Sequence, residues 1–302
     1  MDTSNQYVIN TWYSWIKNLV STYSIDGLRI DTVRHVQQSF WSGFNSAAGV
    51  YCVGEVFSGD QTYVCPYQNV MDGLLNYPLW YPLTQAFQST SGNMTHLVNQ
   101  VNYNKNTCKD TTLLGTFLEN HDNPRFPSLT SDTALDQNAI AFAMLADGVP
   151  IVYEGQEQHY SGTNNGYNRE AIWPSGYSTS NPFYSFIAKI NNVRNHAIYV
   201  DANYLTYMAW PIYSDTTTIA MRKGVNNAQI VGVFSNKGTS GASYSQKIGN
   251  TGFASGATIV EVLGCTTVVA DSTGTITVAM GQGAPKIFYP LTPLKGSGIC
   301  GY

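Results

Sequence analysis

The order of apolar patterns along the chain constrains its fold more than any other feature of the sequence. Up to about residue 204, stretches with apolar residues at helical spacing alternate with short apolar runs that are typical of strands. Beyond that point only short alternating runs separated by turns remain. We therefore predict a domain of βα units over residues 1–204 and an all-β domain, an antiparallel sandwich, over residues 205–302.

Five short runs in the first domain are predicted to be parallel strands, and five stretches are predicted to be helices. The strands cover residues 26–31, 49–55, 70–73, 113–119 and 149–153, and the helices cover 8–20, 37–48, 81–90, 134–145 and 183–194. Five strands are too few to close an eight-stranded βα barrel, so we expect part of such a barrel. In the second domain, strands are expected at 217–222, 229–234, 258–262 and 275–279.

Charge and hydropathy exclude two classes of partner. The net charge is −4 and no dense run of Lys or Arg exists, which disfavours nucleic acid and anionic lipid surfaces. No apolar run approaches the roughly 18 residues of a membrane span, and residues 1–10 lack the pattern of a secretion signal. Only 11% of residues are charged while Tyr, Asn, Ser, Thr and Gly are abundant, a composition that suits an extracellular protein that handles sugars.

Five cysteines, at positions 52, 65, 108, 265 and 300, are too far apart for the short spacings of zinc sites. Their number predicts two disulfides and one free thiol. The chain also contains the motif Asn93-Met94-Thr95, an acceptor pattern for N-glycosylation that occurs often by chance.

Three acidic residues stand at or just beyond the carboxyl ends of predicted strands, where a βα barrel carries its catalytic groups: Asp31, Glu55 and Asp122. Cleavage of a glycosidic bond needs one carboxylate to attack the sugar and a second, protonated carboxyl to donate to the leaving oxygen. Arg29 lies two residues before Asp31, so in a strand both side chains share a face and the guanidinium would keep Asp31 ionised.

Each of these residues also has a simpler structural interpretation. An Asp after a strand commonly caps the next helix, and a triplet such as Asn120-His121-Asp122 is frequent in ordinary turns. Three such strand ends with charged companions favour a catalytic site over separate caps and turns.

Three segments resemble signature segments of the α-amylase family of the fungal secreted type: residues 26–35 (DGLRIDTVRH), 54–56 (GEV) and 117–125 (FLENHDNPR). The resemblance continues through 149–157 (VPIVYEGQE), 168–170 (NRE) and the β domain. It implies the carboxyl-terminal part of a (β/α)8 barrel, from the helix after the third strand onward, followed by the sandwich. It also implies that the first three barrel strands are absent, which leaves two open sheet edges and predicts aggregation or low stability.

The resemblance implies endo-hydrolysis of α-1,4-glucosidic bonds in starch and maltooligosaccharides, with retention of configuration, by a secreted and monomeric enzyme. Asp31 would be the nucleophile, Glu55 the acid and then the base, and Asp122 the carboxylate that holds sugar hydroxyls. Substrate-binding positions would be Arg29, Arg34, His35, Gly59, His121 and Arg169. Arg34 and His35 could instead be merely solvated.

The resemblance further implies calcium as a cofactor and two disulfide pairings. The backbone carbonyl of His35 would be one calcium ligand, with the other ligands outside this chain. Cys65 would pair with Cys108 and Cys265 with Cys300. Arg34 and Ser58 stand where the family pattern has Lys and Asp, which puts the preferred substrate length in doubt.

The residues leave other functions open. A glucan-transferring enzyme would use the same covalent intermediate, an inactive fragment would retain only sugar binding, and a protein-interaction module would need no clustered carboxylates. Longer products at high maltooligosaccharide concentration would identify transfer, and sugar affinity without hydrolysis would identify the inactive fragment.

Overall fold

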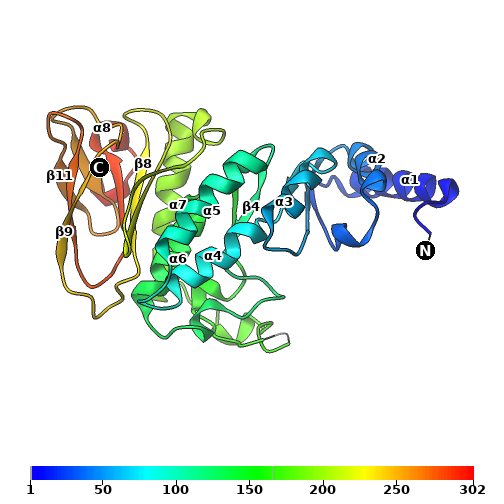
Figure 1. The fold of residues 1–302 in the computed structure, drawn as a ribbon, viewed down its shortest axis with the longest axis horizontal. Helices are drawn as coiled ribbons and strands as arrows, with labels where there is room; N and C mark the ends of the chain where they lie inside the picture. The colour runs from blue at the N-terminus through cyan, green and yellow to red at the C-terminus, as the bar shows by residue number, and fades with distance from the viewer. Residues whose placement is uncertain (1, 165) are drawn as a thin grey trace.

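The computed structural model describes residues 2–164 and 166–302 (Figure 1). Its first part contains five short parallel strands: β1 (Gly27–Ile30), β2 (Tyr51–Gly54), β3 (Gly73–Leu74), β4 (Gly115–Phe117) and β5 (Val149–Ile151). β2 pairs with β1 and β3, and β4 pairs with β5. A bridge between Leu75 and Gly115 joins the two groups. Five parallel strands are therefore present, as predicted, and lie side by side in chain order. The third was predicted at residues 70–73 but spans only Gly73–Leu74, because residues 70–72 form a turn before it.

The helices of this part are α1 (Gln6–Tyr23), α2 (Gln38–Ala48), α3 (Gln61–Val64), α4 (Tyr77–Phe87), α5 (Met94–Thr107), α6 (Thr133–Leu145) and α7 (Pro182–Val200). All of them except α2 begin where a short polar side chain accepts a backbone N–H group. Asp132, for example, accepts from the backbone N–H groups of Ala134 and Leu135 at the start of α6.

Helix α5 was not predicted, because polar residues occupy part of its buried face. Gln100 and Asn104 are both buried on it. The Gln100 amide donates to Asn104 at 2.8 Å, and Asn104 donates to Asn76 at 3.0 Å. Buried amides are tolerated when they are hydrogen-bonded, but they interrupt the apolar stripe that marks a helix in sequence.

The second part is the predicted antiparallel sandwich. A six-stranded sheet has the order β11-β10-β13-β8-β7-β6, and a two-stranded sheet pairs β9 with β12. The strands are β6 (Trp210–Ser214), β7 (Thr218–Lys223), β8 (Ile230–Ser235), β9 (Tyr244–Ile248), β10 (Thr258–Glu261), β11 (Thr266–Val269), β12 (Ile276–Met280) and β13 (Lys286–Pro290), followed by the short helix α8 (Leu291–Leu294). Val231 and Phe288 of one sheet and Val278 of the other share one apolar core.

The other face of the six-stranded sheet packs against helices of the first part, as the ribbon shows for α6, α7 and β8 (Figure 1). Phe142 of α6 lies 5.3 Å from Phe234 of β8, ring centroid to centroid. A buried ion pair joins Lys223 to Asp147 at 2.9 Å. Strands β7 and β8 are thus buried on both faces, and the two parts share one core.

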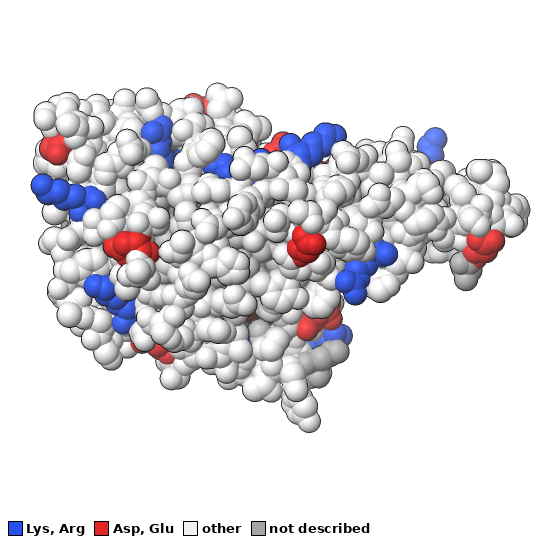
Figure 2. Space-filling model, viewed as in Figure 1, with Lys and Arg blue, Asp and Glu red and all other residues white. Residues whose placement is uncertain are grey.

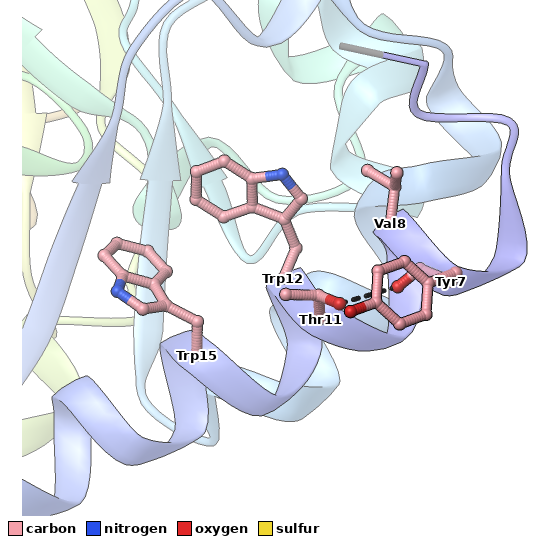
Figure 3. Close-up of a pocket in the computed structure, with 5 residues that line it drawn as sticks. All are labelled: Tyr7, Val8, Thr11, Trp12 and Trp15. Atoms are coloured by element: carbon pink, nitrogen blue, oxygen red, sulfur yellow. Dashed lines mark hydrogen bonds between the residues drawn. The ribbon is translucent and has the colours of Figure 1, made fainter.

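The outer edges of the parallel array are open among the described residues, as predicted. β1 pairs only with β2, and β5 only with β4. Val149 on β5 is 48% exposed. Beyond β1, the outer face of α1 presents Tyr7 and Trp15 beside a shallow apolar groove of about 370 Å³ (Figure 3). No helix within residues 2–164 and 166–302 has the length and apolar character needed to cross a membrane.

Two disulfides are present, Cys65–Cys108 and Cys265–Cys300, and Cys52 is a buried free thiol. This matches the predicted pairing. The first closes a loop of 43 residues that ties the segment before β3 to the end of α5.

Replacing both Cys65 and Cys108 with Ser should lower the free energy of unfolding by about 3–4 kcal/mol, because the unfolded chain regains the entropy of the open loop. Urea unfolding of the double variant and the parent measures the difference, with Cys52 present in both. An unchanged unfolding midpoint would contradict this expectation.

Candidate active site

Asp31 and Glu55 leave two neighbouring parallel strands at the same end. Ile30, the last residue of β1, is paired in register with Gly54, the last residue of β2. Asp31 directly follows Ile30 and Glu55 directly follows Gly54, so both carboxylates lie at the same end of the two strands. Glu55 is buried, whereas the Asp31 side chain is 65% exposed.

Arg29 links these two carboxylates, which agrees with its predicted place on the face of Asp31. Its guanidinium hydrogen-bonds to the Asp31 carboxylate and lies 3.1 Å from Oε1 of Glu55. The Arg29 hydrogen bond is the main reason that the pKa of Asp31 is lowered, and the charges of Arg29 and His121 act in the same direction. Asp31 is therefore held as a carboxylate, the form that a nucleophile requires.

The second oxygen of Glu55 is held by backbone. Oε2 accepts from the N–H of Thr32 at 3.1 Å. Thr32 has a φ of 51°, a left-handed conformation that is rare for a β-branched residue. Such backbone strain concentrates at functional sites. Neither the conformation of Thr32 nor its contact with Glu55 could be foreseen, because the torsion is imposed by the turn between β1 and the short helix Val33–His35.

Asp122 lies on the loop that follows β4 and has partners on both oxygens. Oδ2 is 3.2 Å from Nε2 of His121, and Oδ1 is 3.0 Å from the Arg169 guanidinium. Arg169 also donates from Nε to the His121 carbonyl at 2.9 Å. The structure thus brings together the three predicted residues of this half of the site.

A buried ion network lies behind Asp122. Arg125 is fully buried, with Nε 2.6 Å from Glu170 and a second nitrogen 3.3 Å from Glu119. Its backbone N–H donates to the Gly162 carbonyl at 3.0 Å, and the Gly162 N–H donates to Glu170 at 2.8 Å. These contacts fasten the loop that carries Asp122 to the loop that carries Arg169.

Burial is the dominant influence on Glu119. It raises the pKa of this carboxyl to about 8, and the buried carboxyl of Asp136 adds to the effect. The backbone N–H of Phe126 and the guanidinium of Arg125 act against it. Glu119 and Arg125 belong to the predicted motif at residues 117–125, in which neither has a predicted role. The sequence pattern that could have identified Glu119 and Arg125 is an acidic and a basic residue close together after an apolar strand.

Tyr77 connects the two halves of the site. Its hydroxyl accepts from the Asn120 amide at 2.8 Å, and its ring packs edge-on against Phe57 at 4.5 Å. Burial raises the pKa of Tyr77, and the nearby charges of Glu55 and Asp122 raise it further. Through its contacts Tyr77 lies between Phe57, on the loop after β2, and Asn120, on the loop after β4. Tyr77 was not predicted as a site residue.

The remaining predicted binding residues lie on the segments after β1 and β2. Arg34 and His35 are exposed, and Arg34 donates to the Phe57 carbonyl. A Cβ atom on Gly59 would stand 2.8 Å from the Tyr81 ring, so glycine allows this ring to lie against the loop. Arg34 is thus fixed by backbone, which argues against a merely solvated side chain.

Side chains of the types that commonly bind metals are not grouped in the described part of the chain. Among residues 2–164 and 166–302, no group of three or more His, Cys, Asp or Glu is placed to hold a metal. Calcium takes six to eight oxygen ligands, and the His35 carbonyl would supply one.

Comparisons with known proteins identify the family of the chain. The family described as "Alpha amylase, catalytic domain" matches residues 1–239, and "Alpha-amylase, domain C" matches residues 211–302. Because the two matches overlap, the boundary between residues 204 and 205 stays a prediction.

The chain is similar to Alpha-amylase 2 of Schwanniomyces occidentalis, with 49% identity over 99% of this chain and 59% of the relative. It is 55% identical to Alpha-amylase 1 of Lipomyces kononenkoae, over 99% of this chain and 48% of the relative. A solved α-amylase from Malbranchea cinnamomea superposes with a TM-score of 0.97 at 47% identity, over 99% of this chain and 63% of that one. The chain spans about half to three fifths of the length of these relatives. On its sequence, its fold and the geometry of its carboxylates, it belongs to the α-amylase family.

Proposed function

We propose that this chain supplies the catalytic carboxylates for endo-hydrolysis of α-1,4-glucosidic bonds in starch and maltooligosaccharides. The observation that carries the proposal is the grouping of Asp31, Glu55 and Asp122 at the carboxyl ends of β1, β2 and β4, each with a charged or backbone partner. A pair of carboxyl groups with different environments is what glycoside cleavage requires.

In the first step, the Asp31 carboxylate attacks the anomeric carbon and forms a carbon–oxygen bond to it. The glycosidic bond breaks, and the leaving oxygen takes a proton from Glu55. In the second step, Glu55 accepts a proton from water, whose oxygen displaces Asp31. Two inversions at the same carbon retain the configuration of the product.

Other residues support the proposal by binding rather than by proton transfer. Asp122 and Arg169 present a carboxylate and a cation beside His121, groups suited to hold the hydroxyls of the sugar that is attacked. Arg34, His35 and Gly59 lie on the loops after β1 and β2 and would contact the sugar that leaves. We also infer passage through an oxidising, secretory compartment from the two disulfides, and calcium bound with further ligands from outside this chain.

Incubation of the purified 302-residue chain with soluble starch tests the proposal. Internal bonds of the polymer should be cut, so new reducing ends should appear while the polymer becomes shorter. Proton NMR of the first products should show the α-anomer. A chain that is folded by circular dichroism and releases no reducing sugar would refute hydrolysis by this polypeptide.

Replacing Arg29 with Met should move the acidic limb of the kcat/KM profile to higher pH. Arg29 lowers the pKa of Asp31, so its removal lets Asp31 take up a proton at a higher pH and lose its nucleophilic form. The profile is measured on maltooligosaccharides between pH 3 and pH 8, about the range in which carboxyl groups titrate. An acidic limb that stays in place would show that Arg29 does not set the ionisation of Asp31.

A further inference from the structure

One sequence motif is not used by the catalytic site: Asn93-Met94-Thr95, at the start of helix α5. It is the single Asn-x-Ser/Thr motif in the 302 residues. Met94 is 1% exposed and anchors the segment in the core, while Asn93 and Thr95 on either side of it are exposed. Both residues that define the motif therefore face solvent from a fixed backbone.

The side chain of Asn93 is oriented by its role as the helix cap. Its Oδ1 accepts from the backbone N–H of His96 at 2.9 Å. With the oxygen turned to the helix, the amide nitrogen Nδ2 points away from it, and within the described part of the chain Nδ2 donates to no protein atom. The Thr95 hydroxyl likewise has no protein partner there.

Capping and glycosylation use different atoms of this amide. Attachment of a sugar replaces one hydrogen on Nδ2 and leaves Oδ1 free to accept from His96. The modified residue can therefore keep the helix cap, which is worth about 0.5–2 kcal/mol. An acceptor Asn whose nitrogen donated to the protein core would lose such a bond on modification, and Asn93 has none to lose.

The surroundings of Asn93 leave room for a large substituent. It follows a turn that packs on the β domain, where the Asn236 amide donates to the Gly92 carbonyl at 2.9 Å. That contact holds the backbone of the turn and leaves the side chain of Asn93 outside. Helix α4 separates this turn from Tyr77 at the active site by 11 residues, about 16 Å of helix. At that separation, a glycan on Asn93 would not compete with substrate.

We propose that Asn93 carries an N-linked oligosaccharide. Nδ2 attacks the anomeric carbon of an oligosaccharide joined to a polyprenol diphosphate, and a carbon–nitrogen bond forms. The bond from that carbon to the phosphate oxygen breaks, the lipid diphosphate leaves, and the amide gives up one proton. The inference rests on the secretory passage proposed above and is independent of hydrolytic activity.

Translation of the full chain behind a cleavable secretion signal, with endoplasmic reticulum microsomes, tests the site directly. Only the chain that is protected from added protease is analysed, so import is established in each sample. We expect one discrete increase in the mass of the chain. Treatment with peptide N-glycosidase should remove this increase and convert Asn93 to Asp. Protected chain at the unmodified mass would overturn the proposal.

Three variants separate the modification from the fold. Asn93→Asp keeps an oxygen that can cap α5 but has no amide nitrogen, and Thr95→Ala keeps Asn93 intact while removing the motif. Both should lose the mass increase completely. Thr95→Ser retains the motif and should keep it. A mass increase that persists in Thr95→Ala would show that another residue carries the sugar.

Discussion

Replacing Glu55 with Gln is expected to lower kcat on soluble starch by about 10²–10⁴-fold, the range that positioned acid–base groups contribute. Gln has nearly the same shape and can still accept from the Thr32 N–H, but it cannot give a proton to the leaving oxygen. Because sugar contacts on the Asp122 side are untouched, KM should change little by comparison. Initial rates of reducing-sugar release measure both constants.

The matched control for this variant is Glu154→Gln. Glu154 is an exposed residue beyond the end of β5, and the same chemical change there should leave kcat within about twofold, as expected for a residue outside the acid–base machinery. Near-parental activity of Glu55→Gln would exclude Glu55 as the proton donor. Equal losses in both variants would point to a general effect of lost charge.

Replacing Arg125 with Met should lower the free energy of unfolding by about 3–5 kcal/mol, the cost of breaking a buried ion pair from one side. Arg125 is fully buried between Glu119 and Glu170, and its removal leaves both carboxyl groups without their shared hydrogen-bond donor. Chemical unfolding followed by tryptophan fluorescence measures the change.

Two further variants make this expectation specific. Arg169→Met removes a half-exposed pair with Asp122, which should cost only about 0–1 kcal/mol. Combining Arg125→Met with Glu119→Gln removes the buried carboxyl that lost its partner, and should recover part of the stability. If Arg125→Met lowered the free energy of unfolding no more than Arg169→Met does, the buried network would not be what holds the loop that carries Asp122.

Arg125 also illustrates why stability and catalysis are joined in this site. The loop from Asn120 to Arg125 bears Asp122 on its exposed side and Arg125 on its buried side. Asn168 adds to the attachment by donating to the carbonyls of His121 and Asn123, at 3.0 and 2.7 Å. A loosened loop would misplace Asp122 without changing any group that touches substrate.

Local sequence patterns were sufficient for the architecture and for the positions of the acidic residues beyond the strand ends. The period of apolar residues separates the βα units from the β strands, because side chains repeat every 3.6 residues on a helix and every two on a strand. The same period of two places Arg29 and Asp31 on one face of β1, which the contact between them confirms. Chain order places Asp31, Glu55 and Asp122 at one end of parallel strands.

Tertiary structure alone decided which charged groups are buried and what holds them. Glu119 and Glu170 are 51 residues apart in the sequence, yet both bind Arg125. Tyr77 likewise contacts Phe57 after β2 and Asn120 after β4. Helix α5 was not predicted for the same reason: its buried amide Asn104 has its partner, Asn76, on another segment of the chain. The energy of a buried polar or charged group depends on the partners that folding brings to it from distant segments, and no local pattern of residues contains that information.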